Sequence, residues 1–398
     1  MTVLVLVAAG SRYETKKLNG VAHFAEHMFF KGTKKRPTAL DISSEVDSIG
    51  GEFNAFTSKE FTGFYIKSSA EHIDLDLEVL SDMLLNSKFE QTEIDRERKV
   101  VSEELRMYLD NPMRHVGDVF EELLYGDQPL GWDTVGTLDS LKNINRRQFL
   151  EYVDHFYHPS NMLITIAGGV TVEAAKKIAE KYFGSLTDKK AASFLPVKFQ
   201  QKSPAIKLHT KKTEQAHFIL GVRSYPRASE HRYKLAVLNA ILGTSMSSRL
   251  FIELRERRGL AYYVRSSVDD YKDAGAFQVA SGVQPKAIEE AILVTLEQFK
   301  KISQQEVPEA ELKKAKDYIK GKLVLELEGS QEVASTFGLQ QLLENKTRTP
   351  EEVLREIDKV RTADLKKLAQ DIFTDDKLNL AVIGPYKDEA KFAKILKI

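Results

Sequence analysis

Residues 142–168 read KNINRRQFLEYVDHFYHPSNMLITIAG, and residues 358–384 read DKVRTADLKKLAQDIFTDDKLNLAVIG, so one pattern occurs twice without a gap. In each copy an amphipathic helix leads through a short turn into an apolar strand that ends at a glycine. The apolar positions coincide in five pairs: Phe149 with Leu365, Tyr152 with Leu368, Phe156 with Ile372, Ile164 with Leu380, and Ile166 with Val382. This match predicts an internal duplication and therefore two related α/β halves.

The rest of the first half alternates strands with helices. We expect strands at Val3–Ala9, Glu52–Phe56, Phe61–Ser68 and Asn161–Ala167, and helices at Val21–Phe30, Thr38–Ile49, Ile73–Leu85, Thr92–Leu109, Leu141–Phe156 and Val172–Tyr182. Residues 189–204 combine weak periodicity with two prolines and predict a linker. The fold class is therefore α+β, with halves at 1–188 and 205–398 that pack a sheet with helices and face each other as a clamshell.

Composition excludes several classes of function. The 398 residues include 58 Lys and Arg against 58 Asp and Glu, so no overall positive field favours nucleic acid or an anionic membrane. There is no cysteine, so a metal must be held by His and carboxylates. The longest apolar stretch, Val3–Ala9, is too short to span a membrane and lacks the basic leader of a signal peptide. We expect a cytoplasmic protein.

The segment His23-Phe-Ala-Glu-His27 predicts a metal site. On a helix, His23 and His27 project from one face about one turn apart, which is the geometry that two metal-binding imidazoles need. Glu26 lies on the same face, placed to take a proton from a metal-bound water. The neighbouring residues are apolar, so burying these three groups without a partner would cost several kcal/mol. The alternative is a pair of satisfied core histidines beside a paired glutamate.

A third ligand is expected from the helix at Thr92–Leu109. Its charged stripe, which includes Glu103, faces solvent, whereas Glu97 and Glu104 lie on the inward stripe two turns apart. From this pattern either inward glutamate could bind the metal, with the other supporting the site; an ordinary ion pair is the alternative for each.

The chain resembles the pitrilysin and mitochondrial-processing-peptidase family of zinc metallopeptidases, in its short two-domain bacterial form. The resemblance rests on the inverted H-x-x-E-H motif within residues 23–33, HFAEHMFFKGT, and on residues 50–58, GGEFNAFTS. It extends through nearly the whole chain.

The resemblance implies roles for further residues. It implies that Glu104 is the third zinc ligand, because in the family 76 residues lie between the second histidine and that ligand, and that Glu97 supports the catalytic site. It also implies that the strand with Asn54, Ala55 and Phe56 binds an extended peptide, a mode that an open strand edge permits. Arg255 and Tyr262 match the family's residues that reach the substrate from the second half, where a guanidinium and a phenol suit a developing oxyanion.

The second half lacks the motif. Aligning Gly32-Thr33 with Gly243-Thr244 sets His23, Glu26 and His27 opposite Lys234, Val237 and Leu238 respectively. We therefore expect one Zn²⁺ per chain.

These observations predict a zinc-dependent endopeptidase that hydrolyses extended or unfolded peptides in a two-domain chamber, with metal-bound water as nucleophile. The resemblance implies a homodimer or a heterodimer with a related chain, and we expect no nucleic-acid or membrane partner. The alternatives are a non-catalytic or partner-dependent subunit of this fold, and a module that captures peptides without cleaving them. The family usually has one or two strands before the position of Met1, so we expect a shortened N-terminus.

Overall fold

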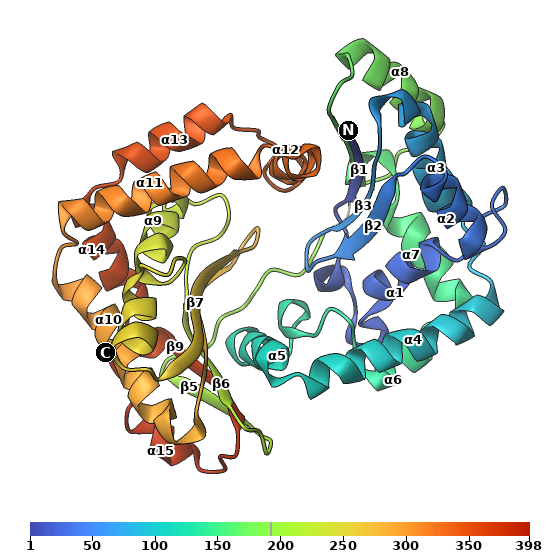
Figure 1. The fold of residues 1–398 in the computed structure, drawn as a ribbon. Coiled ribbons are helices and arrows are strands. Elements are labelled where there is room, and N and C mark those ends of the chain that lie inside the picture. Colours follow the sequence, from blue (N-terminus) through green and yellow to red (C-terminus); the bar gives the residue numbers. More distant parts are fainter. Residues whose placement is uncertain (192) are drawn as a thin grey trace. The chain divides into compact units, whose positions relative to one another are not determined.

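The computed structural model describes residues 1–191 and 193–398 and divides them into two compact units. Unit 1 contains Met1–Met107, Trp132–Leu195 and Glu326–Arg348; unit 2 contains Tyr108–Gly131, Pro196–Leu325 and Thr349–Ile398. The α+β fold class is confirmed. The units do not follow the chain in simple order, because one helical segment from each half is counted with the other unit (Figure 1).

The helices are α1 (Val21–Phe29), α2 (Ala39–Asp47), α3 (Ile73–Asn86), α4 (Gln91–Asp110), α5 (Pro112–Tyr125), α6 (Leu138–Asn143), α7 (Arg146–Phe156), α8 (Val172–Phe183), α9 (Arg232–Leu242), α10 (Ile288–Gln304), α11 (Glu309–Glu326), α12 (Ser330–Glu344), α13 (Pro350–Lys359), α14 (Thr362–Ile372) and α15 (Glu389–Ala393). The strands are β1 (Thr2–Val7), β2 (Glu52–Thr57), β3 (Thr62–Lys67), β4 (Met162–Ala167), β5 (Ala205–Thr210), β6 (Ala216–Arg223), β7 (Ala261–Asp270), β8 (Gly275–Val283) and β9 (Leu378–Gly384).

Unit 1 is built on a four-stranded antiparallel sheet in the order β2-β3-β1-β4. Side chains alternate between its two faces. Leu4 and Leu6 of β1 pack with Ala334 of α12 on one face. On the other face, Phe64 of β3 contacts Phe29 of α1, with ring centroids 5.2 Å apart. The sheet is therefore covered by α12 on one side and by the helix that carries the histidine motif on the other.

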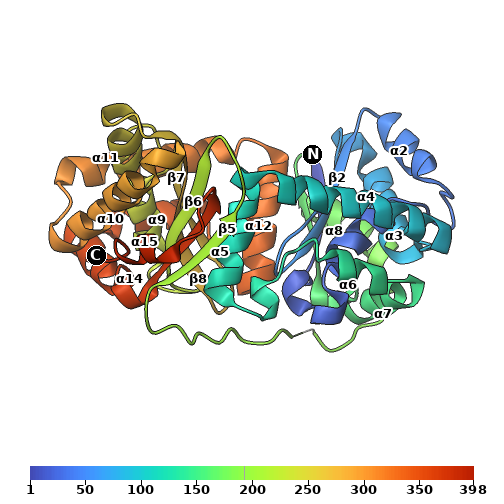
Figure 2. The same cartoon turned by 90° about the horizontal axis from the view of Figure 1, so that it is seen from below.

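Unit 2 repeats this plan with one strand more, in the order β5-β9-β6-β8-β7. Phe218, Leu220 and Val222 of β6 face the core built with α9, α10 and α14. Ile219 faces the opposite way and packs against α5, which Figure 2 shows beside β5. Thus α5 covers one face of the sheet in unit 2, as α12 does in unit 1.

The element bounds agree with the predicted duplication. Helix α7 and strand β4 correspond to α14 and β9 in the ungapped alignment, and both helices begin and end at aligned residues. Contacts agree as well, because α1 packs against β2 and α7, whereas α9 packs against β7 and α14.

One prediction about helices was wrong, and one helix was not predicted. Leu141–Phe156 is not one helix, because α6 ends at Asn143 and α7 begins after Asn145, whose side chain accepts a hydrogen bond from the backbone of Arg147. Helix α5 was not predicted. Pro112 is the first residue of α5, a position where its missing N–H costs nothing.

The predicted linker at 189–204 has no helix or strand among its described residues, and Ala192 lies outside the described residues. The compact units change over within it, between Leu195 and Pro196. The sequential division at 1–188 and 205–398 stays a prediction, because the contact-based units also exchange residues 108–131 and 326–348.

Candidate metal centre

Helix α1 is held rigidly by its apolar side chains. Val21, Ala22, Phe24, Ala25, Met28 and Phe29 are all buried. Burying a large apolar side chain contributes about 1.5–3 kcal/mol, so this short helix is stabilised by packing and needs little intrinsic propensity. The residues left over on its remaining face are His23, Glu26 and His27, which are partly accessible.

Three metal-binding side chains converge from α1 and α4. Nε2 of His23 lies 3.7 Å from Oε1 of Glu104, and Nε2 of His27 lies 3.4 Å from Oε2 of the same carboxylate. One donor atom from each residue can be chosen so that all lie within 4.8 Å of one another. Among residues 1–191 and 193–398 this is the only group of three or more His, Cys, Asp or Glu side chains that meets this geometry.

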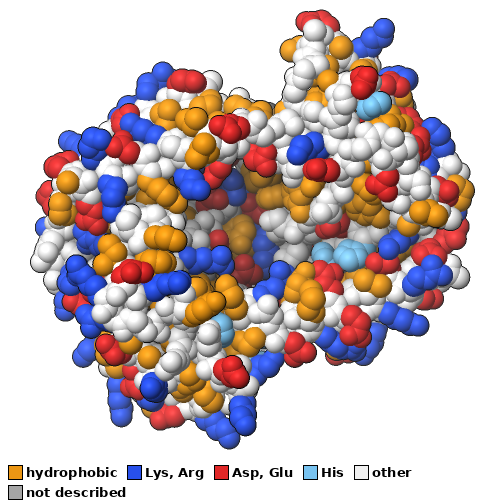
Figure 3. All heavy atoms as spheres, in the orientation of Figure 1, with side chains coloured by type: hydrophobic (Ala, Val, Ile, Leu, Met, Phe, Trp, Pro, Cys, Tyr) orange, Lys and Arg blue, Asp and Glu red, His pale blue; other side chains and the backbone are white. Residues whose placement is uncertain are grey.

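The donor set fits zinc. Imidazole nitrogens are borderline donors and a carboxylate oxygen is a hard donor, and both suit Zn²⁺. Three protein ligands are the number found in catalytic zinc sites. The side chains of His23 and His27 are 12% and 22% exposed, so a metal can reach them from solvent. Figure 3 shows histidine side chains at the surface of unit 1, near the position where Figure 1 labels α1.

Glu97 supports His27 from the buried side. Its Oε1 lies 3.2 Å from Nδ1 of His27, the nitrogen that would stay available when Nε2 binds a metal. Its Oε2 forms an ion pair of 2.6 Å with Lys31, which follows the end of α1. Burial raises the pKa of Glu97, but the hydrogen bonds to His27 and Lys31 outweigh burial and hold the pKa below its ordinary value.

The surroundings of His27 favour its protonated form in the absence of a metal. Burial by itself lowers the pKa of His27, whereas its hydrogen bonds to Glu104 and Glu97 raise it, and the net result is a pKa of about 9. The two carboxylates thus create a place where positive charge is stabilised. A dication can replace that proton, because metal ligation requires the neutral imidazole.

Glu26 has the surroundings of a general base. Its Oε2 accepts a hydrogen bond of 2.5 Å from the hydroxyl of Thr57 on β2. Burial raises the pKa of Glu26, and the hydrogen bond from Thr57 lowers it in part, so the pKa remains above its ordinary value. A carboxylate with a pKa moved towards neutrality is a better proton acceptor at physiological pH.

The phase of α4 agrees with the inward stripe. Glu97 is buried, and the side chain of Glu104 is 20% exposed, whereas that of Glu103 is 71% exposed and pairs with Arg106. Glu104 therefore lies with the histidines, and Glu103 faces solvent.

The predicted peptide-binding strand is an edge strand, because β2 pairs only with β3 among the described residues. Its residues divide between the two faces of the sheet. Ala55 lies opposite Phe64 on the face of α1, whereas Asn54 and Phe56 lie on the face covered by α12. The Asn54 side chain accepts a hydrogen bond from the backbone of Ala55.

Arg255 and Tyr262 both lie in unit 2, on irregular backbone. Arg255 belongs to a π-helical segment, Phe251–Arg257, and its guanidinium donates a hydrogen bond of 2.7 Å to the carbonyl of Tyr262. The register of β7 shifts between Ala261 and Tyr263, so Tyr262 is the bulged residue, and it is 72% exposed. π-Helical segments and bulges are frequent at functional sites, and here they place both side chains at the surface of unit 2.

Sequence reasoning missed two residues of this centre. Lys31 has a detectable signal, because it lies four residues beyond His27 and so continues the same helical face. Thr57 has a weaker one, since alternation in β2 places it on the same face as Ala55.

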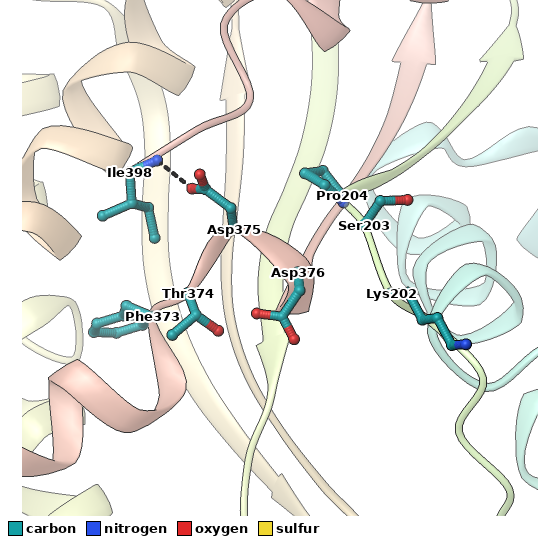
Figure 4. A pocket seen from close by; sticks show the side chains of 8 residues that line it. All are labelled: Lys202, Ser203, Pro204, Phe373, Thr374, Asp375, Asp376 and Ile398. Carbon is teal, nitrogen blue, oxygen red and sulfur yellow. Dashed lines mark hydrogen bonds between the residues drawn. The ribbon is translucent and has the colours of Figure 1, made fainter.

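A cavity lies within unit 2. It measures about 520 Å³ and is lined by Lys202, Ser203, Pro204, Phe373, Thr374, Asp375, Asp376 and Ile398 (Figure 4). Asp375 accepts a hydrogen bond from the backbone N–H of Ile398. Its lining has no histidine, so it lacks the donor set of the centre in unit 1.

None of the helices in the described ranges is long and apolar enough to cross a membrane.

Comparisons with known proteins show the family of this chain. Residues 1–138 match the family model described as insulinase, peptidase family M16, and residues 143–319 match the model described as the peptidase M16 inactive domain. An uncharacterized zinc protease of Bacillus subtilis is 37% identical over 96% of this chain and 92% of its own length. Another, from Mycobacterium leprae, is 36% identical over 100% of this chain and 89% of its own length.

Solved structures agree too. A protease from Helicobacter pylori superposes with a TM-score of 0.90 at 27% identity, covering 96% of this chain and 93% of that one. A peptidase M16 inactive domain from Pseudomonas fluorescens, at 18% identity and a TM-score of 0.89, covers 97% of this chain and 93% of its own and shares the fold. The chain therefore belongs to peptidase family M16, the pitrilysin-like family.

Proposed function

We propose that the protein is a zinc-dependent endopeptidase that hydrolyses extended or unfolded peptides. The observation that carries the proposal is the meeting of His23, His27 and Glu104 within 4.8 Å, with Glu26 on the same helix. The zinc-protease names of the relatives support the choice of metal and of reaction class.

Each residue of the centre has a proposed role in peptide hydrolysis. When bound, Zn²⁺ supplies a Lewis acid that polarises the scissile carbonyl and makes water acidic. Glu26 accepts a proton from the attacking water at its carboxylate and later donates it to the departing amine nitrogen. Glu97 and Lys31 hold His27 in the orientation and tautomer that metal binding requires.

The substrate would bind as an added strand along the open edge of β2, because backbone groups there accept an extended chain of any sequence. Asn54, Ala55 and Phe56 are the proposed contacts. The roles of Arg255 and Tyr262 in substrate binding stay predictions. The dimeric state is also a prediction, and sedimentation of the purified chain tests it.

The experiment is metal analysis combined with a quenched-fluorescence assay on an unfolded peptide. We expect one zinc per chain and hydrolysis that a chelator abolishes. Glu26→Gln should keep its zinc and lose activity by about 10²–10⁴-fold, the usual contribution of a general base. A Glu26→Gln protein that cleaves at the wild-type rate would refute the assignment of Glu26. A chain that binds no zinc and leaves peptides intact would refute the proposal as a whole.

A further inference from the structure

Glu14 lies at the N-terminal end of the metal helix, although it precedes that helix by several residues. Its side chain is buried, with the residue 7% exposed. Its Oε2 accepts hydrogen bonds of 2.7 Å from the backbone N–H of Gly20 and 2.9 Å from the side-chain amide of Asn19. Its Oε1 accepts one of 2.7 Å from the backbone N–H of Ala22, the residue before His23.

These contacts satisfy groups that the helix itself leaves without partners. The first N–H groups of an α-helix have no intrahelical acceptor, and the positive end of the helix dipole favours a carboxylate. The N-cap residue, Gly20, has no side chain to supply one. It cannot be replaced by a capping residue, because its φ is +94° and a Cβ would lie 2.3 Å from the carbonyl oxygen of Val135. Glu14 therefore takes over the capping role from a distance.

The start of α1 is fixed from a second side as well. The amide of Asn19 donates to the carbonyl of Asp133, and the hydroxyl of Ser140 donates to the carbonyl of Asn19. Rotation or translation of the helix start would break several buried hydrogen bonds together. His23 lies within the first turn of this helix, so its position depends directly on that anchor.

Unit 2 supplies an internal control. In the alignment that pairs α1 with α9, Glu14 corresponds to Tyr225, whose phenol donates to Asp371. The residue aligned with Gly20 is His231, and its N–H is accepted by the hydroxyl of Ser229. The start of α9, which lacks metal ligands, thus donates to the neutral hydroxyl of Ser229. The start of α1 instead donates to the buried carboxyl group of Glu14.

We infer that Glu14 is a positioning residue for the metal centre: it fixes the first turn of α1 so that His23 meets the donors of His27 and Glu104. The inference rests on the proposed zinc function. It assigns to Glu14 an effect on metal affinity that a general contribution to folding would not produce.

The test compares Glu14→Gln with Asp76→Asn, measuring zinc affinity by chelator competition and unfolding of the metal-free protein. Gln keeps the length of the side chain but replaces one acceptor oxygen with an NH2 group, which can only donate a hydrogen bond. Asp76 on α3 is also fully buried and accepts a hydrogen bond of 2.6 Å from Ser68, which belongs neither to α1 nor to α4. We expect Glu14→Gln to weaken zinc binding about 10–100-fold, the range typical of groups that orient metal ligands. Asp76→Asn should lower stability and leave zinc affinity unchanged.

Glu14→Asp provides a second variant if Glu14→Gln does not fold, since it keeps the carboxyl group and shortens the reach by one methylene. It should fold and bind zinc more weakly than the wild type. Wild-type zinc affinity in a folded Glu14 variant, or an equal loss in Asp76→Asn, would overturn the inference. A wild-type chain that binds no zinc would instead refute the proposed function, so the two failures are distinguishable.

Discussion

Helices α1 and α9 have corresponding places in the two units, yet one presents metal-binding groups and the other is part of a core. His27 aligns with Leu238 and Glu26 with Val237, and both residues of α9 are fully buried. The same helix position can therefore stabilise a unit through apolar contact or display a polar centre. The second choice requires partners for the polar groups, and Glu97 provides one for His27 and Thr57 one for Glu26.

The largest expected effect comes from converting α1 towards α9. His27→Leu places the residue of the second unit at the aligned position and removes one nitrogen donor. We expect zinc binding to be lost and peptide hydrolysis to fall by a factor on the order of 10³ or more, while the far-ultraviolet circular dichroism stays unchanged. Activity above a tenth of the wild-type value would show that the comparison has the wrong residues aligned.

A change at the aligned position of α9, Leu238, should affect the stability of the protein instead. Leu238→Ala leaves a cavity in the core of unit 2 and should reduce the free energy of unfolding by about 2–5 kcal/mol. Zinc affinity, measured well below the melting temperature, should not change. Urea denaturation with and without zinc checks both statements, and a selective loss of zinc affinity would argue against separate roles for the two helices.

The pH dependence of zinc binding sharpens the contrast further. The pKa of His27 is raised to about 9, so in the metal-free protein its proton contributes stability below pH 6.5 that is lost as the pH rises through 9. Zinc competes with that proton, so its affinity should rise by about tenfold per pH unit up to pH 9 and then level off. Chelator competition between pH 6.5 and 9.5 measures this; an affinity independent of pH would contradict it.

The smallest expected effect concerns the lysine behind the centre. Lys31→Met removes the 2.6 Å ion pair with Glu97 and should weaken zinc binding about tenfold, because Glu97 then holds His27 less firmly. Lys34→Met is the matched control, since Lys34 is an exposed lysine three residues further on. Equal zinc affinities for the two variants would show that the ion pair does not support the centre.

The two sheets differ as well. Strand β9 lies between β5 and β6 and is buried throughout, whereas its counterpart β4 is an edge strand of the described sheet of unit 1 and is mostly half-buried. Their sequences, MLITIA and LNLAVIG, are similarly apolar, so pattern alone does not distinguish a central strand from an edge strand.

Local sequence determined much of this protein. Periodicity placed α1, α4, α8 and the strands of the first half to within two residues, because apolar spacing follows directly from helix and strand geometry. The same geometry placed His23, His27 and Glu26 on one helical face and separated Glu104 from Glu103. It did not choose between Glu97 and Glu104 as a ligand, since both lie on the inward stripe.

Only the tertiary structure decided what meets that stripe. It set Glu104 against both histidines and Glu97 against Lys31, brought Thr57 to Glu26, and anchored the metal helix on Glu14. It also exchanged residues 108–131 and 326–348 between the units. Contacts between residues distant in the chain depend on how whole elements pack, and the periodicity of one segment carries no information about the segment that will cover it.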